Sequence, residues 1–173
     1  VTTRTAGFNT TDLADMDESG TAIMIILMLI GGSPGSTAGG MKTATFAVLF
    51  LSAITVFSRR NDVQCFKRRI SDEAVRSAGA VLFMYLVLFL TSGIIISRVE
   101  NLPLLTCLFE TSSAIGTVGL TLGITSGLSA VSRAILMILM FFGRVGGLTL
   151  IYAALPSADS QNSRLPLEKI SVG

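Results

Sequence analysis

Long runs of uncharged residues constrain this 173-residue chain more than any other feature. No charged residue occurs in 19–41, in 77–97 or in 111–132. A membrane-spanning helix needs about 20 apolar residues, so runs of this length predict a membrane protein. Buried core helices of a large soluble domain are the alternative interpretation. Such helices rarely lack charge on every face, which favours the membrane.

The composition argues against an enzyme. Histidine, the commonest general base and zinc ligand, is absent. Cys65 and Cys107 give neither a disulfide framework nor a metal-binding spacing. A disordered chain is also excluded, because half of the residues are hydrophobic and 14% are charged. We therefore expect a protein that is not an enzyme and has no nucleic-acid partner, and because it begins at Val1 we expect its N-terminal context to be missing.

The uncharged runs differ in kind. Residues 77–97 read as one plain spanning helix, whereas the apolar residues of 21–57 are interrupted at 31–40 by five glycines and one proline. This composition does not hold a straight helix. Non-helical backbone persists inside a membrane only where it lines a cavity or is packed in protein. We predict one crossing broken by an intramembrane loop, with an ordinary linker as the alternative.

Charge predicts the orientation of these crossings. The segment 58–76 carries six lysine and arginine residues, which places it in the cytoplasm. The acidic stretch that follows Phe8 would then be external. After a last crossing at 128–155, the polar tail 156–173 would also be cytoplasmic. The basic segment could equally bind anionic membrane lipid.

A short pattern of threonine, small apolar residue, glycine and large apolar residue occurs twice, at 5–8 and at 117–120. At the same offset, Gly31 aligns with Gly143 and Gly32 with Arg144. Identities are few, so chance competes with duplication, which we favour as a parallel repeat. The second unit contains a helix at 77–97, a short helix at 102–115, the pattern at 116–121 and a helix at 128–155. The first unit, 1–57, retains only the pattern and the broken helix.

This pattern suits an ion filter. A dehydrated cation needs oxygen ligands, which backbone carbonyls supply when several strands direct them at one axis. Glycine permits the required backbone angles, and a preceding half-helix directs its negative end at the cation. The candidate filter residues are Thr5, Ala6, Gly7, Gly116, Thr117, Val118 and Gly119. A non-transporting scaffold packed through glycines would explain the helices but not these repeats.

Four segments, 3–10, 31–43, 116–120 and 142–147, resemble the membrane subunit of the Trk/Ktr/HKT family of potassium-uptake transporters. The likeness is closest to the bacterial Ktr type and covers nearly the whole chain. It implies an all-α membrane protein of helix–pore-loop–helix units around one pore. This chain would supply the third unit from its filter onward and the fourth unit, about half of the pore.

The resemblance also implies the cargo and the setting. Members with serine for the first filter glycine favour sodium, so Gly7 and Gly119 imply K⁺ transport, with Na⁺ left open as a coupling ion. The setting would be a bacterial plasma membrane. The implied partners are membrane lipid, a second copy in a homodimer and a cytosolic nucleotide-binding regulatory subunit.

A gate is implied as well, formed by the intramembrane loop and a facing basic residue. Its candidate residues are Gly31, Gly32, Ser33, Pro34, Gly35, Gly39, Gly40 and Arg144. A charge near the middle of a membrane helix costs about 2.5–3.5 kcal/mol on insertion scales, so Arg144 should face water or loop carbonyls. Snorkelling to the headgroups is the alternative. Lys42 is interpreted as ending the broken region near the inner leaflet.

Overall fold

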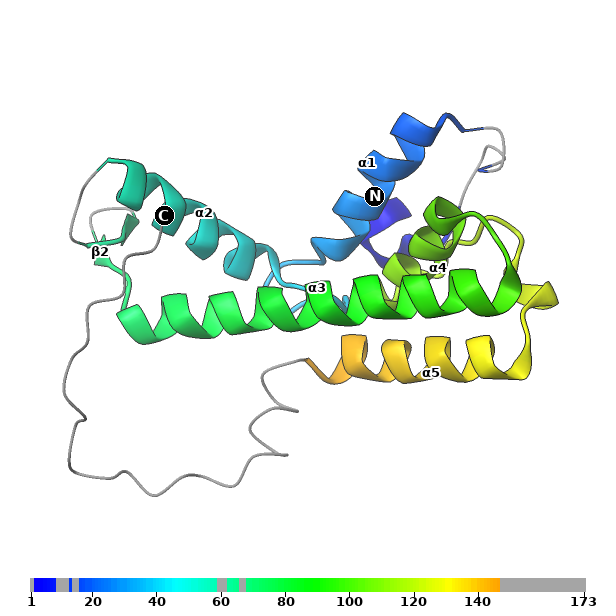
Figure 1. Ribbon diagram of the computed structural model, residues 1–173. Helices are drawn as coiled ribbons and strands as arrows, with labels where there is room; N and C mark the ends of the chain where they lie inside the picture. The colour runs from blue at the N-terminus through cyan, green and yellow to red at the C-terminus, as the bar shows by residue number, and fades with distance from the viewer. Residues whose placement is uncertain (1, 9–12, 14–15, 59–61, 66–67, 147–173) are drawn as a thin grey trace, which may run out of the picture.

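The computed structural model describes residues 2–8, 13, 16–58, 62–65 and 68–146 (Figure 1). Five α-helices dominate this part of the chain. They are α1 (Glu18–Leu29), α2 (Thr43–Phe57), α3 (Asp72–Glu100), α4 (Leu104–Gly116) and α5 (Ala130–Val145). Two short helical turns lie at Thr2–Ala6 and Thr125–Gly127, and β1 (Gln64–Cys65) pairs antiparallel with β2 (Arg68–Arg69). The architecture agrees with the predicted all-α class.

Helix α3 is the long axis of the molecule. Its 29 residues make it the one helix in the described part of the chain that is long and apolar enough to cross a bilayer. It exceeds the predicted 77–97 at both ends, and its first turn includes residues expected in the cytoplasmic loop. The reason is a good helix start: the Ser71 side chain accepts from the Ala74 amide, and Asp72 and Glu73 occupy the positive end of the helix.

Helices α1 and α2 diverge from a common point above the middle of α3 (Figure 1). They have 12 and 15 residues, so each is too short to cross a membrane alone. The chain between them is non-helical, and a parallel bridge between Ile30 and Met41 brings its two ends together. The break predicted between two apolar half-helices is therefore present as a compact loop at 30–42.

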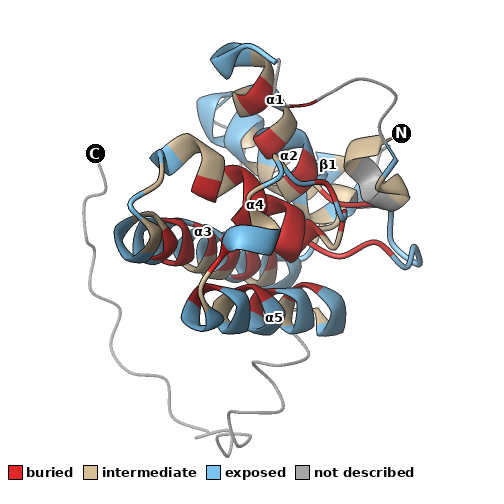
Figure 2. Cartoon of the chain, turned by 90° about the vertical axis from the view of Figure 1, so that its right-hand side faces the viewer, coloured by how far each residue is buried: buried red, intermediate tan, exposed pale blue. Residues whose placement is uncertain are grey.

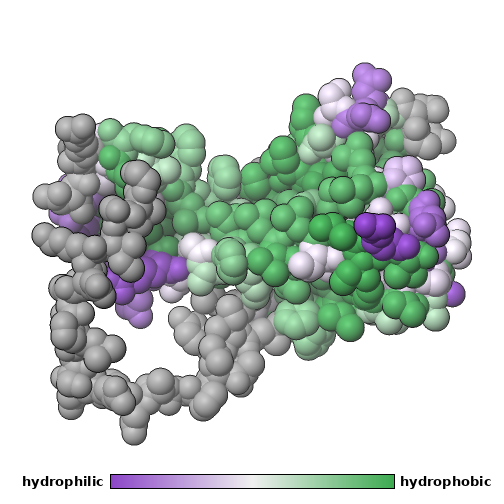
Figure 3. Space-filling view, in the orientation of Figure 1, coloured by the Kyte–Doolittle hydropathy of each residue, from purple (hydrophilic) through white to green (hydrophobic). Residues whose placement is uncertain are grey.

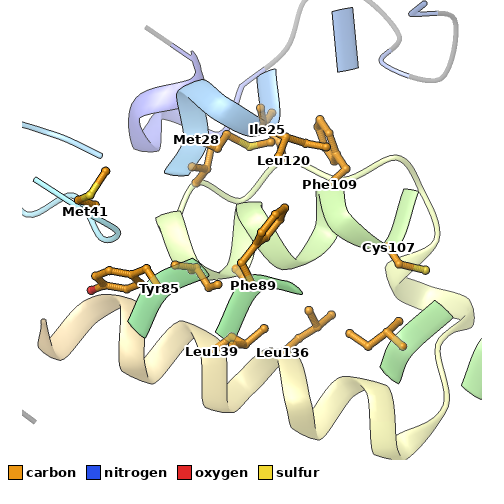
Figure 4. Close-up of a cluster of buried hydrophobic side chains, with 14 of the residues drawn as sticks. Ile25, Met28, Met41, Tyr85, Phe89, Cys107, Phe109, Leu120, Leu136 and Leu139 are labelled. Atoms are coloured by element: carbon orange, nitrogen blue, oxygen red, sulfur yellow. The ribbon is translucent and has the colours of Figure 1, made fainter. Parts of the chain in front are cut away.

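Helix α4 lies at the centre of the core and packs against α1, α3 and α5 (Figure 2). It begins at Leu104 after Pro103, close to the predicted start, and every residue from Phe109 to Gly116 is buried. Around it, Met28, Phe89 and Leu139 reach into one hydrophobic cluster from three other helices (Figure 4). The second half of this short helix is thus enclosed by protein.

Helix α5 runs alongside α3 in the opposite direction (Figure 1). Ser129 caps its start, and the helix is described to Val145. The rest of the predicted helix 128–155 and the tail 156–173 lie outside the described residues.

The surface seen in Figure 3 is hydrophobic along the middle of α3 and hydrophilic at the two ends of the molecule. Large apolar side chains of α3 and α5, such as Phe83, Ile94 and Phe141, are exposed. An apolar band between two polar ends is the pattern expected of a membrane protein. At one end lies the small β1–β2 hairpin, where the Arg69 guanidinium is 3.0 Å from the Asp62 carboxylate.

Candidate functional site: the filter segments and the glycine-rich loop

The second predicted filter segment begins with a sharp turn at the end of α4. Gly116 is the last helical residue, and Thr117 has the left-handed angles φ 52° and ψ 40°. The amides of Thr117 and Val118 donate to the carbonyls of Ala114 (3.1 Å) and Ser113 (2.9 Å). These bonds satisfy carbonyls at the helix terminus. The non-helical chain therefore starts one residue later than the predicted 116–121.

Beyond the turn, the chain alternates between the core and the exterior. Val118 and Leu120 are 4% and 3% exposed, whereas Gly119 is exposed and has φ 87°. A Cβ added to Gly119 would meet no atom within 4 Å. Among the described residues, no amide or hydroxyl donates to the carbonyls of Val118 or Gly119.

The first predicted filter segment differs from expectation over most of its length. Thr5 and Ala6 lie in the π-helical turn Thr2–Ala6 instead of an extended strand. Gly7, with φ 67°, is the first residue to leave the helix, because the left-handed region is open to glycine. A Cβ on Gly7 would lie 2.9 Å from the Val118 carbonyl oxygen. The two copies of the pattern, far apart in sequence, therefore lie in contact.

The glycine-rich loop packs against the C-terminal end of α4. The Gly39 amide donates to the Thr117 hydroxyl oxygen at 3.0 Å. A Cβ on Gly39 would lie 2.7 Å from both the hydroxyl oxygen and the methyl carbon of Thr117. Only glycine permits so close an approach. The predicted gating loop is thus bonded directly to the threonine of the second filter segment.

The rest of the loop has a fixed base and an exposed tip. Gly31 and Gly32 are buried, and their backbones bond to Met41 (2.7 Å) and Thr43 (3.1 Å). Gly40 is also buried, and a Cβ there would be 3.5 Å from the Cα of Gly116. The tip, formed by Ser33, Pro34 and Gly35, is exposed.

Two basic side chains bind successive carbonyls of the loop. The Lys42 ammonium donates to the carbonyls of Ser36 (3.1 Å) and Ala38 (2.5 Å). The Arg144 guanidinium donates to the carbonyl of Thr37, which lies between them. Arg144 thus meets a loop carbonyl, as one of its two interpretations required. Lys42 folds back over the loop, an arrangement that its interpretation as a terminating residue did not include.

Gly143, in the last turn of α5, allows α5 to approach α4. A Cβ at Gly143 would overlap the Ile115 carbonyl oxygen. In the sequence this position belongs to the repeat alignment and to the segment 142–147. The structure makes it the contact point between the last helix and the residue that precedes the second filter segment.

Sequence reasoning missed Glu110. Its carboxylate is buried in α4 and accepts hydrogen bonds from three residues that follow the filter segment: Thr121, Leu122 and Thr125. One signal could have found it. Glu110 is the lone charged residue of a short apolar helix, and an ionisable residue within a membrane usually has a function.

This arrangement, a buried half-helix that ends at two adjoining glycine turns, agrees with a comparison of the sequence with known families. Residues 1–163 match the TrkH family, described as a cation transport protein. The chain belongs to this family. The resemblance drawn from the four motifs is confirmed, and membership in a family of transporters is consistent with the prediction that the chain is not an enzyme.

Individual relatives are named as uptake proteins. The chain is 36% identical over 179 residues to the potassium/sodium uptake protein NtpJ of Enterococcus hirae, covering 100% of this chain and 40% of that protein. It is 38% identical over 172 residues to the Ktr system potassium uptake protein D of Bacillus subtilis, covering 99% of this chain and 38% of the relative. The chain therefore spans about two fifths of the length of these relatives.

A solved structure supports the fold. The crystal structure of the potassium transporter TrkH from Vibrio parahaemolyticus matches with a TM-score of 0.72 and 22% identity, over 90% of this chain and 35% of that one. The likeness confirms the predicted all-α transporter fold.

Proposed function

We propose that this chain forms part of a pathway for K⁺ uptake across the plasma membrane. The observation that carries the proposal is the contact of Gly7 with the Val118 carbonyl, beside carbonyls that no described residue bonds. The chain would contribute the end of a third pore unit at 1–57 and a fourth unit at 77–155, joined by the cytoplasmic segment 58–76. The names of the relatives, which describe potassium uptake, support K⁺ as the cargo.

In this proposal the filter strips water from the ion and replaces it with main-chain oxygen. The filter residues are Thr5, Ala6, Gly7, Gly116, Thr117, Val118 and Gly119. Helix α4 directs its negative C-terminal end at this point from within the protein, which favours a cation there. Gly119 itself is exposed, and a Cβ added there would meet no atom within 4 Å, so space for a passing ion is available beside this segment.

The loop and Arg144 form the proposed gate. The loop rests on Thr117 through Gly39, and Arg144 and Lys42 bind its carbonyls. Opening a path below the filter requires the loop to leave Thr117. The basic side chains then favour the closed position, because hydrogen bonds from charged donors are the stronger ones.

The proposal extends to a second ion and to partners. The name of NtpJ, which includes sodium, supports Na⁺ as a second or coupling ion. The basic segment at 58–76 and the tail are proposed to face the cytoplasm, where a nucleotide-binding regulatory subunit would bind. A homodimer is proposed as the assembly.

Growth on limiting potassium tests the proposed function. We expect the complete gene, expressed in a strain that lacks its own potassium uptake systems, to restore growth at micromolar K⁺ and to support K⁺ influx. A non-transporting scaffold would reach the membrane in equal amount, measured by immunoblot, and leave both growth and influx at the level of the empty vector.

Arg144→Ala tests the gate. Losing a hydrogen bond from a charged donor should destabilise the closed state by about 1.5–3 kcal/mol. The equilibrium should therefore shift toward the open state by at least about tenfold, and K⁺ flux should rise. The K⁺ flux of Arg144→Lys should fall between those of the wild type and Arg144→Ala, since lysine keeps the charge but not the planar donor group.

The matched control is Arg133→Ala, which removes an exposed arginine from the first turns of the same helix. Its flux should equal that of the wild type. Initial rates of K⁺ uptake at equal membrane expression check the series. Wild-type flux in Arg144→Ala would reject the gate role.

A further inference from the structure

The outer end of the second filter segment is held by a single carboxylate from α4. Glu110 is 4% exposed. One carboxylate oxygen accepts from the Thr121 hydroxyl at 2.5 Å and the Leu122 amide at 3.0 Å, and the other accepts from the Thr125 hydroxyl at 3.0 Å. All three donors follow the filter in sequence. The helix that precedes the filter therefore also anchors the chain that leaves it.

The charge of Glu110 is compensated by these donors. In the part of the chain that the structure describes, no lysine or arginine forms an ion pair with it. A buried carboxylate without hydrogen bonds would be strongly unfavourable, so these three donors stabilise Glu110 in its buried position. Bonds to a carboxylate are also stronger than neutral ones. The turn after the filter is thereby fixed relative to α4.

The filter segment is thus fastened to one helix at both ends. At its inner end the amides of Thr117 and Val118 bond to α4, and at its outer end Leu122 bonds to Glu110. Between them, the side chains of Val118 and Leu120 are buried in the core, where Leu120 lies near Phe109 (Figure 4). Carbonyl oxygens that are held apart in this way cannot move inward around a smaller cation.

We propose that Glu110 is a positioning residue that sets the discrimination of K⁺ over Na⁺ by holding the outer end of the filter. The inference rests on the proposed function, since it assumes that ions pass at residues 117–119. It assigns a role to the hydrogen bonds of the carboxylate, not to contact between Glu110 and the ion.

Two substitutions at one position test the proposal in the complete transporter. Glu110→Leu keeps the approximate size and removes all three bonds; the ratio of uptake efficiencies (Vmax/KM) for K⁺ and Na⁺ should fall at least about tenfold, the factor for losing one bond to a charged group. Glu110→Gln should retain most of the ratio. Its amide oxygen accepts from Thr121 and Leu122, and its amino group donates to the Thr125 hydroxyl, which also accepts. If the Gln variant were as unselective as the Leu variant, the negative charge of Glu110 and not its hydrogen bonds would explain the discrimination, and the positioning role would be overturned.

Glu100→Leu is the matched control. Glu100 is also an acid at this end of the molecule with three bonds, from the Ser129 amide (3.0 Å), the Ser129 hydroxyl (2.6 Å) and the Ser132 hydroxyl (2.5 Å), but these join α3 to α5. We expect it to lower the melting temperature and leave the K⁺/Na⁺ ratio unchanged. If it changed the ratio as far as Glu110→Leu does, general loosening would explain both and the proposal would fail.

Thr125→Val covers the case in which Glu110→Leu does not reach the membrane. It removes one donor at a half-buried position, so the ratio should shift in the same direction by less. An unchanged ratio in the Thr121→Val, Thr125→Val double variant would overturn the inference. Failure of the proposed function is distinct, because then the wild-type protein itself would show no K⁺ uptake.

Discussion

Alanine at Gly119 should abolish most of the discrimination between K⁺ and Na⁺, whereas alanine at Gly123 should preserve it. Both glycines have left-handed backbones, with φ 87° and 88°, and neither has an atom within 4 Å of an added Cβ. The conformational cost of alanine, about 1–2 kcal/mol, is therefore the same at both positions. The two positions differ in the hydrogen bonding of their backbone groups.

At Gly119 the strained residue carries a carbonyl that no described residue bonds. Rotation of this peptide to relieve the strain would turn the oxygen away from the ion, and the new methyl group would occupy the open space beside it. At Gly123 the amide bonds to the Thr121 hydroxyl, and alanine keeps that amide. Strain alone gives about a tenfold change in an equilibrium, so the K⁺/Na⁺ ratio of Gly119→Ala should fall by at least that factor.

Uptake of K⁺ and Na⁺ in cells with equal membrane expression measures the two ratios, and melting of the purified proteins in detergent measures the two stabilities. We expect similar losses of stability and unequal losses of discrimination. Equal loss of discrimination in the two variants would mean that backbone strain near the outer surface is sufficient, and that Gly119 has no special place.

The sequence predicts the helices well because the signals for them are local. An uncharged run specifies α3, and Pro103 marks the start of the short helix within one residue. Five glycines and a proline specify the break between α1 and α2. Each of these features depends on residues that are neighbours in the chain, so no tertiary contact is needed to infer them.

The end of the pore helix could not be inferred in the same way. Threonine seldom adopts a left-handed backbone, yet Thr117 does so with φ 52°. Its hydroxyl accepts a bond from the Gly39 amide, 78 residues away in sequence. A contact between residues so far apart in the chain gives no signal in the sequence around either of them. For this reason the predicted extended segment begins too early, at Gly116.

The polar contacts of the site depend on the same kind of separation. Arg144 meets the Thr37 carbonyl across 107 residues, and the sequence could predict only that this charge needs a partner. Glu110 bonds to residues 11 to 15 positions ahead, after the chain has reversed direction. Sequence therefore predicts which residues are costly in a membrane, and the fold decides which partners reduce that cost.

Alanine at Gly143 should disturb folding more than alanine at Gly119 or Gly123. The added Cβ would overlap the Ile115 carbonyl oxygen. The clashing atom belongs to the backbone of the buried second half of α4, so no side-chain rotation relieves the clash. Overpacking of a core costs about 1–3 kcal/mol, and relief at this contact requires α5 to move away from α4.

Gly79→Ala is the matched control, because Gly79 is also a helical glycine and an added Cβ there meets nothing within 4 Å. Alanine in a helix interior is about 0.5–1 kcal/mol more favourable than glycine, so this variant should melt slightly higher than the wild type. Gly143→Ala should melt lower, by several degrees in detergent.

The functional consequence distinguishes packing from ion contact. Ile115 immediately precedes the helix end at Gly116 and the turn at Thr117, so displacement of α5 should loosen the inner end of the filter. K⁺ uptake in Gly143→Ala should therefore fall together with stability, and lowering the assay temperature should restore both. A variant that melts like the wild type would show that α5 moves without cost, and that the close approach of the two helices contributes nothing to holding the filter.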